Sequence, residues 1–154
     1  MKQLSLEIND AYSQTEMEEK EFHQSVVNHL FENWLTRYAD QKFISTSSHS
    51  PKVTSTISDM PSGPNNQLRS VTEMLAIRSA DAKNFIEVFH EKLKTLPGDY
   101  QRIIERKYLQ VGPDGKWVSD EIVYPELHLS RTAYFELKPK ALYWLGLALI
   151  GIEC

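Results

Sequence analysis

Apolar residues recur every three or four positions in two long stretches of the chain, which is the spacing of an amphipathic helix. In the first stretch, Thr15 and Glu18 form a capping box, which predicts a helix that begins at Thr15 and continues to Tyr38. Its apolar stripe consists of Phe22, Val26, Leu30, Phe31, Trp34, Leu35 and Tyr38.

The second stretch runs from residue 68 to residue 96 and stops at Pro97-Gly98. Its apolar residues repeat every seven positions: Leu68, Leu75, Ala82, Phe89 and Leu96. Ile86 and Leu93 extend this pattern, whereas Thr72 and Ser79 interrupt it with polar side chains. A coiled-coil seam stays open as an interpretation, but the pattern favours a long helix packed against the first one.

The C-terminal third predicts short helices separated by turns. Residues 99–109 form one helix with an apolar face, and residues 111–115 have the composition of a turn at the tip of a small hairpin. Ser119 is expected to cap a helix that runs to about Leu127, which Pro125 shortens or bends. Ser130 is expected to cap a last helix from 131 to 152. No segment predicts a sheet, so the expected fold class is all-α.

Residues 119–142 combine a short helix, a tight turn at His128-Leu129 and a capped second helix. This is the helix-turn-helix arrangement, in which the second helix enters the major groove of DNA with its N-terminal residues at the base edges. The positions expected to face inward are Val123, Leu127, Leu129, Tyr134, Leu137, Ala141 and Leu142. The positions left outside are Arg131, Thr132, Phe135, Glu136 and Lys138.

Charge restricts where a nucleic acid can bind. The 154 residues include 17 Lys and Arg against 21 Asp and Glu, a net charge of −4, which excludes a basic coat and leaves only a local patch. Residues 1–40 carry 3 basic and 8 acidic side chains, whereas residues 128–145 carry 3 basic and 1 acidic. The charge is therefore bipolar along the sequence, with an acidic N-terminal part and a modest basic cluster near the C-terminus.

The sequence lacks the residue patterns that other classes of function require. Cys154 is the single cysteine, so no intramolecular disulfide and no cysteine-based metal site is expected. The five histidines have no ligand spacing, and the chain contains no glycine-rich phosphate loop and no nucleophile motif. We expect no cofactor, no metal, no enzymatic activity, no secretory signal and no membrane span, and therefore a cytoplasmic protein.

Three runs of sequence resemble the ArpU family of phage transcriptional regulators. They are residues 100–109 (YQRIIERKYL), 123–130 (VYPELHLS) and 134–142 (YFELKPKAL), and the segments 51–55 and 61–64 look like that family's variable region. The family looks related to RinA-type late-gene activators, and its C-terminal part is similar to the promoter-recognition module of sigma factors. The resemblance implies a DNA-binding activator of phage late genes in a bacterial host cell.

The chain departs from that pattern at three positions. His128 stands where such turns usually carry glycine, so it is expected to adopt a left-handed backbone. Pro139 is expected to kink or split the last helix, because it removes the amide that bonds to Phe135. Together with Glu136, it makes the recognition helix less cationic.

Chemistry suggests a role for each exposed residue of this unit. Arg131 and Thr132 are expected to read bases, and Glu136 to accept a hydrogen bond from cytosine while repelling phosphate. Lys138 and Lys140 are expected to anchor phosphates, and the amides near Ser119 to receive one. Arg102, Arg106 and Lys107 would extend the basic track. The full set of DNA-binding candidates is Ser119, Ser130, Arg131, Thr132, Phe135, Glu136, Lys138 and Lys140.

The expected organisation has four parts. They are an acidic helical arm (1–40), a Ser/Thr/Pro-rich linker or loop (41–67), a long helix (68–97) and the helix-turn-helix module (98–154). Trp34, Trp117 and Trp144 are expected to pack in the core rather than to stack on bases. Residues 141–152 are apolar nearly all round their helix, which requires burial under the N-terminal helices or against a second copy and favours a homodimer.

Two hypotheses follow for the partner. In the first, the chain binds double-stranded DNA near a promoter, with RNA polymerase as a further candidate partner for the acidic run Glu18, Glu19 and Glu21. In the second, it is a helical adaptor that binds proteins, or the target of another phage or mobile-element regulator, and binds little DNA itself. The net acidity, Glu136 and Pro139 favour the second hypothesis, whereas the motif runs and the basic cluster favour the first.

Overall fold

The computed structural model describes residues 2–47 and 66–152, and their side chains over 13–47 and 71–152. Most of the predicted linker (48–65) lies outside the described residues. The helical elements are α1 (Lys2–Leu30), the π-helical turn η1 (Phe31–Leu35), α2 (Thr36–Thr46), α3 (Asn66–Lys94), α4 (Gly98–Ile104), the π-helical turn η2 (Glu105–Leu109), α5 (Asp120–Glu126) and α6 (Arg131–Leu149). The described chain is mostly helical and contains no strand, which confirms the all-α class.

The first helical segment is longer than its sequence pattern indicates. α1, η1 and α2 follow one another without a break, so the predicted start at Thr15 is wrong, because the helix already begins at Lys2. At η1 the hydroxyl of Thr36 donates a 2.9 Å hydrogen bond to the carbonyl oxygen of Phe31, five residues back. From Val26 onward the apolar stripe is buried except for Phe31, which is half-buried, whereas Phe22 is 51% exposed.

The second helix, α3, packs against α2. Trp34 stacks on Phe85 with ring centroids 4.7 Å apart, and the hydroxyl of Tyr38 lies 2.8 Å from Nε2 of His90. The prediction of two packed helices is therefore confirmed. Within the described residues the seven-residue seam is covered only in the second half of α3, because Leu75 is 37% exposed while Ala82 is fully buried.

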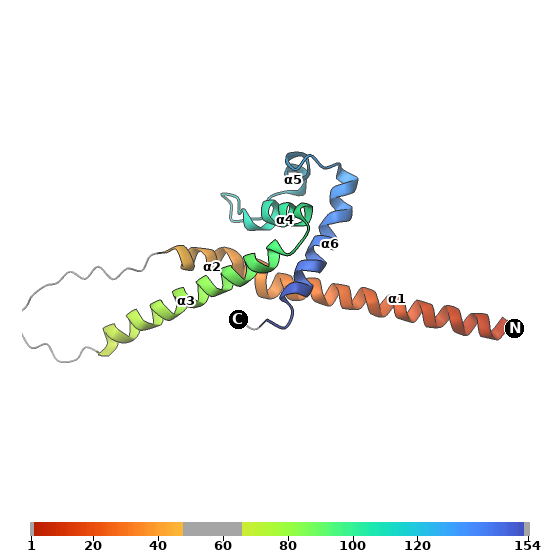
Figure 1. Ribbon diagram of the computed structural model, residues 1–154, viewed down its shortest axis with the longest axis horizontal. Helices are drawn as coiled ribbons and strands as arrows, with labels where there is room; N and C mark the ends of the chain where they lie inside the picture. Colours follow the sequence, from red (N-terminus) through yellow and green to blue (C-terminus); the bar gives the residue numbers. More distant parts are fainter. Residues whose placement is uncertain (1, 48–65, 153–154) are drawn as a thin grey trace, which may run out of the picture.

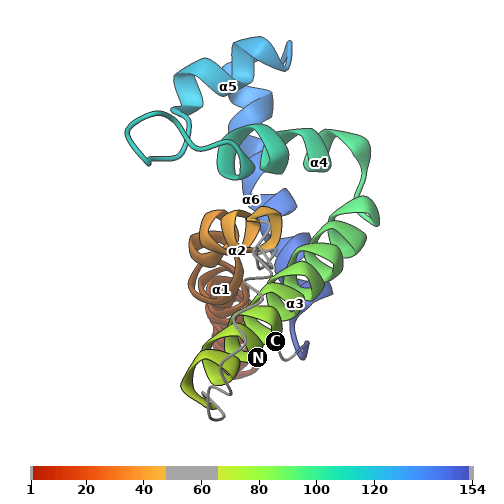
Figure 2. The same cartoon turned by 90° about the vertical axis from the view of Figure 1, so that its left-hand side faces the viewer.

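The last helix, α6, crosses α1 and also lies beside α3 and α4 (Figure 2). At the crossing, a Cβ atom on Gly146 would lie only 2.7 Å from Cγ1 of Val26 and 3.0 Å from its carbonyl oxygen. The two backbones meet there because residue 146 has no side chain. Leu145 and Leu149 beside it are fully buried, so the predicted burial of this apolar helix holds on one side.

The opposite side of α6 corrects one prediction. Trp144 is 54% exposed, so it does not pack in the core, since α1, α3 and α4 cover only one side of the helix. Trp34 is 1% exposed and confirms the prediction. Trp117 is 37% exposed and packs against Phe31 and Tyr108 from the surface, so the predicted core position is wrong for this residue too.

Two helices extend beyond this packed body. Figure 1 shows the N-terminal part of α1 and the N-terminal part of α3 projecting in opposite directions. Every side chain from 13 to 25 is exposed, and so is every side chain from 71 to 78. Among the described residues, no helix is both long and apolar enough to cross a membrane.

Candidate nucleic-acid interface

Helices α5 and α6 share a small apolar cluster with α4. Ile103, Val123 and Tyr134, one residue from each helix, are fully buried in it. The partly buried residues around them are Val118, Tyr124, Leu127, Leu129 and Leu137. The predicted inward positions of this segment are therefore confirmed, and the cluster holds α5 and the first half of α6 as one unit.

The turn between α5 and α6 has the backbone that the sequence predicts. His128 has φ of 57°, in the left-handed region, and its amide donates a 3.0 Å hydrogen bond to the carbonyl oxygen of Pro125. The next amide, of Leu129, donates to the carbonyl oxygen of Tyr124 at 3.0 Å. These bonds close the turn tightly enough for Leu129 to reach the cluster.

The N-terminal caps of the two helices differ. Oγ of Ser130 accepts a 3.1 Å hydrogen bond from the amide of Ala133, which confirms the predicted cap of α6. Ser119 stands at the N-cap position of α5 but makes no side-chain cap hydrogen bond, so the prediction that its side chain caps this helix is wrong.

Pro139 does not split α6, which continues from Arg131 to Leu149. A single lost amide removes one hydrogen bond, and the buried Tyr134 before it and Ala141 after it hold the two halves in register. The predicted split is therefore wrong.

Asp120, the first residue of α5, collects hydrogen bonds and charges from two other elements. Its carboxylate accepts a 2.6 Å hydrogen bond from the hydroxyl of Tyr134 and a 2.9 Å bond from Nζ of Lys138, both on α6. Nζ of Lys107 lies 3.3 Å away and donates to the carbonyl oxygen of Val118 at 2.5 Å. Three elements are thereby fixed to one carboxylate.

The environment of Asp120 keeps it ionised. Burial raises the pKa of this carboxyl, but the hydrogen bonds from Tyr134 and Lys138 and the charges of Lys138 and Lys107 outweigh burial, so the pKa lies below its usual value. Burial and the bond to Asp120 raise the pKa of the Tyr134 phenol, which stays protonated and donates.

These contacts correct part of the predicted basic track. The Lys138 side chain is only 19% exposed and paired with Asp120, so its ammonium is not a free phosphate anchor. Arg106 is bound to Glu126 and Gln110. Arg102 lies 3.7 Å from Asp99 and 3.4 Å from the carbonyl oxygen of Leu127. Arg106, Lys107 and Lys138 therefore join helical elements to one another.

A smaller set of side chains faces solvent at the start of α6. Arg131 is 71% exposed and lies 4.0 Å from Oε1 of Glu121, a pair too exposed to hold it firmly. Its guanidinium also lies 5.8 Å from the ring centroid of Phe135, which is 41% exposed. The remaining exposed candidates are Ser119, Ser130, Thr132, Glu136 and Lys140. Arg131, Thr132 and Phe135 thus lie within the first two turns of a capped helix, with one further cation at Lys140.

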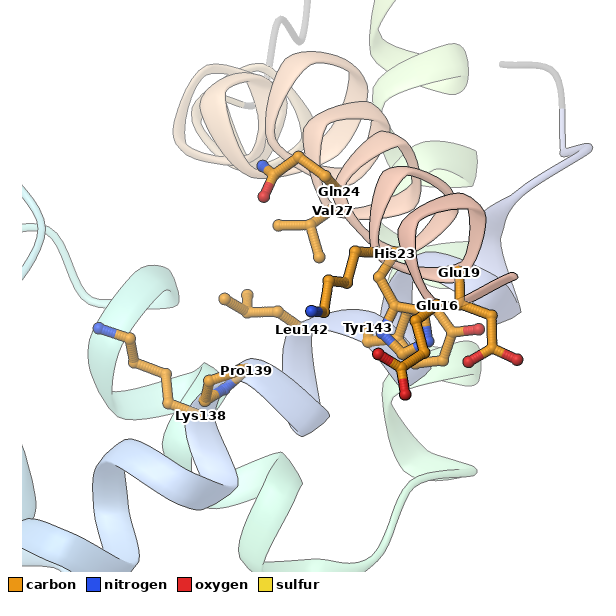
Figure 3. Close-up of a pocket in the computed structure, with 10 residues that line it drawn as sticks. Glu16, Glu19, His23, Gln24, Val27, Lys138, Pro139, Leu142 and Tyr143 are labelled. Carbon is orange, nitrogen blue, oxygen red and sulfur yellow. The ribbon is translucent and has the colours of Figure 1, made fainter. Parts of the chain in front are cut away.

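A groove between α1 and α6 was not expected from the sequence. It encloses about 490 Å³ and is lined on α1 by Glu19, His23 and Val27, among others, and on α6 by Lys138 and Tyr143. Figure 3 shows these residues, with His23 stacked on Tyr143 at 3.7 Å between ring centroids. No sequence signal identifies it, because it depends on where α6 crosses α1. The described residues contain no group of three or more His, Cys, Asp or Glu side chains arranged to hold a metal ion.

Comparison with known proteins gives one relationship. The chain is 30% identical over 96 residues to an uncharacterized phage-related protein of Listeria innocua serovar 6a. The match covers 60% of this chain and 64% of that protein, so the chain spans slightly less than two thirds of the relative's length. No protein-family model matches the chain, and no solved structure matches it. The similarity supports a phage-associated protein.

Proposed function

We propose that this chain is a sequence-specific DNA-binding regulator of transcription that reads the major groove with the start of α6. The observation that carries the proposal is the α5–turn–α6 unit, with its own buried cluster, its left-handed turn at His128 and a capped second helix. A helix held this way on a third helix presents its first turn outward, as helix-turn-helix proteins do.

The exposed residues suit base reading better than bulk phosphate binding. Arg131 can pair bidentately with guanine, Thr132 can contact either base type, and Phe135 supplies an apolar surface for a thymine methyl group. The resemblance to the ArpU family and the similarity to a phage-related protein favour a phage regulator, and the family favours late-gene activation.

The test is selection of random genomic fragments on the purified protein, followed by affinity measurements on the enriched site. Arg131→Ala is expected to weaken specific binding by about 1–3 kcal/mol and to relax preference at one position. Lys116→Ala, an exposed cation on the hairpin-like loop, is the matched control and leaves the preferred site unchanged. Unchanged site selection in Arg131→Ala contradicts its role as a base reader.

One observation favours the second function, a protein-binding adaptor. Arg106, Lys107 and Lys138 are engaged by acceptors within the fold, so few cations remain to bind phosphates. If no fragment is enriched in moderate salt and DNA affinity shows no sequence preference, the adaptor function replaces the regulator.

A further inference from the structure

The buried face of α3 continues beyond the elements that cover it. Ala82 and Phe89 face the core, and the helical repeat places Val71, Met74 and Leu75 on the same face upstream. These three side chains are 54%, 52% and 37% exposed. These exposures show that the described elements leave this part of the face largely open, whereas Arg37 and Gln41 of α2 lie beside Asp81, Asn84 and Phe85 further along α3.

The projecting part of α1 also carries an exposed apolar face, and acidic side chains flank it. Phe22 lies one turn before the buried Val26 and continues its apolar face, yet it is 51% exposed. The helical register places Glu18 and Glu19 on either side of that face. Upstream, the sequence keeps the three- and four-residue spacing of this face at Leu4, Ile8, Ala11 and Thr15.

We propose that the chain forms a two-fold dimer in which the projecting part of α1 from one copy covers the exposed apolar face of α3 in the other. Charge supports this pairing, because α1 presents acid beside Phe22, and Arg78 is the charged residue on the apolar face of α3. Among the described side chains, Arg78 has no ion-pair partner.

The lengths and directions of the two helices also fit. The exposed stretch of α3 from residue 71 to 78 is about 12 Å long, and α1 from residue 2 to 22 is about 30 Å long, so α1 is long enough to cover it. The two projections point in opposite directions (Figure 1). A second copy turned by 180° and placed alongside therefore brings each α1 next to the other copy's α3. In each such pair the two helices run parallel, with the N-terminal end of α1 beside the N-terminal end of α3. The same contact then forms twice, once from each copy, and the assembly stops at two copies, as a two-fold interface requires.

Sedimentation velocity of the full chain tests the proposal directly, without DNA. Twice the chain mass of 17.8 kDa is expected. Met74→Asp and Phe22→Asp should each raise the dimer dissociation constant at least about tenfold, because each buries a carboxylate in the apolar contact. Ile77→Asp is the matched control: Ile77 is 56% exposed on the same helix but lies off this face, so its dimer should persist. Circular dichroism of each variant confirms that the helices remain.

Charge reversal identifies the partner helix. Arg78→Glu should weaken the dimer, and adding Glu18→Lys and Glu19→Lys should restore it. A monomer at all concentrations overturns the proposal, as does a dimer that tolerates Met74→Asp. If Met74→Asp separates the copies but Phe22→Asp and the charge reversals have no effect, the copies meet through α3 alone and the pairing with α1 is wrong. None of these outcomes depends on whether the chain binds DNA.

Discussion

The hydroxyl of Tyr134 donates a 2.6 Å hydrogen bond to the carboxylate of Asp120, which joins the middle of the apolar cluster to the first residue of α5. The same carboxylate binds Lys138 and lies beside Lys107. The orientation of α5 against α6 therefore depends on one ionised group as well as on the apolar cluster.

Asp120→Asn should reduce the free energy of unfolding by about 1–3 kcal/mol at neutral pH, because it removes the charge that two lysines face. Asp40→Asn, an exposed position on α2, is the control and should change stability by less than about 0.5 kcal/mol. Urea unfolding measures both. Equal stability of the two variants contradicts the role of Asp120.

Acid should weaken the wild-type protein through the same group. Because the pKa of Asp120 is lower in the folded state, its stabilisation is present above the ordinary carboxyl pKa of about 4 and is lost as the pH falls through the folded-state value. Urea unfolding at pH 7 and near pH 3 should show a smaller loss in Asp120→Asn than in the wild type. An identical loss in both proteins argues against the lowered pKa.

Gly146→Ala should destabilise the protein by about 1–3 kcal/mol, because the new methyl group meets the side chain and carbonyl oxygen of Val26 at the crossing of α1 and α6. Gly98→Ala is a matched control, since a Cβ there meets no atom within 4 Å. Thermal unfolding compares them, and a harmless Gly146→Ala would mean that the two helices separate easily.

His128→Gly should stabilise the turn by up to about 1 kcal/mol, because the left-handed backbone at φ 57° strains any residue with a Cβ atom. His128 is exposed, so little packing is lost. His128→Val should destabilise, since a β-branched residue tolerates this conformation least. The reverse order of melting temperatures contradicts the strain.

Two lysines of α6, the exposed Lys140 and Lys138, which is paired with Asp120, can be compared by replacing each with glutamine. If the proposed function holds, Lys140→Gln should reduce the slope of log affinity against log salt by about 1, because its ammonium is available to a phosphate. Lys138→Gln should leave that slope nearly unchanged and lower the free energy of unfolding instead, since Asp120 already neutralises Lys138. A slope reduced equally by both variants would show that Lys138 leaves Asp120 to bind DNA.

The sequence predicted the short-range features of this fold well. The cap at Ser130, the left-handed His128 and the inward positions Val123 and Tyr134 all follow from spacing and backbone preference within about ten residues. The capping pattern at Thr15 failed because a continuing helix satisfies the same amides that a cap would.

Long-range features could not be predicted in the same way. That Lys138 faces Asp120 rather than solvent depends on residues 18 positions apart in a folded unit. The exposure of Trp144 and the groove at His23 depend on where α6 crosses the other helices, which helical periodicity does not specify.

Helix α6 belongs to both apolar clusters, since Tyr134 lies in the smaller one and Leu145 and Leu149 lie in the larger. Breaking either cluster exposes part of the same helix, which is 19 residues long. The α5–α6 unit and the helical body are therefore expected to melt together in one cooperative transition, with equal calorimetric and van't Hoff enthalpies.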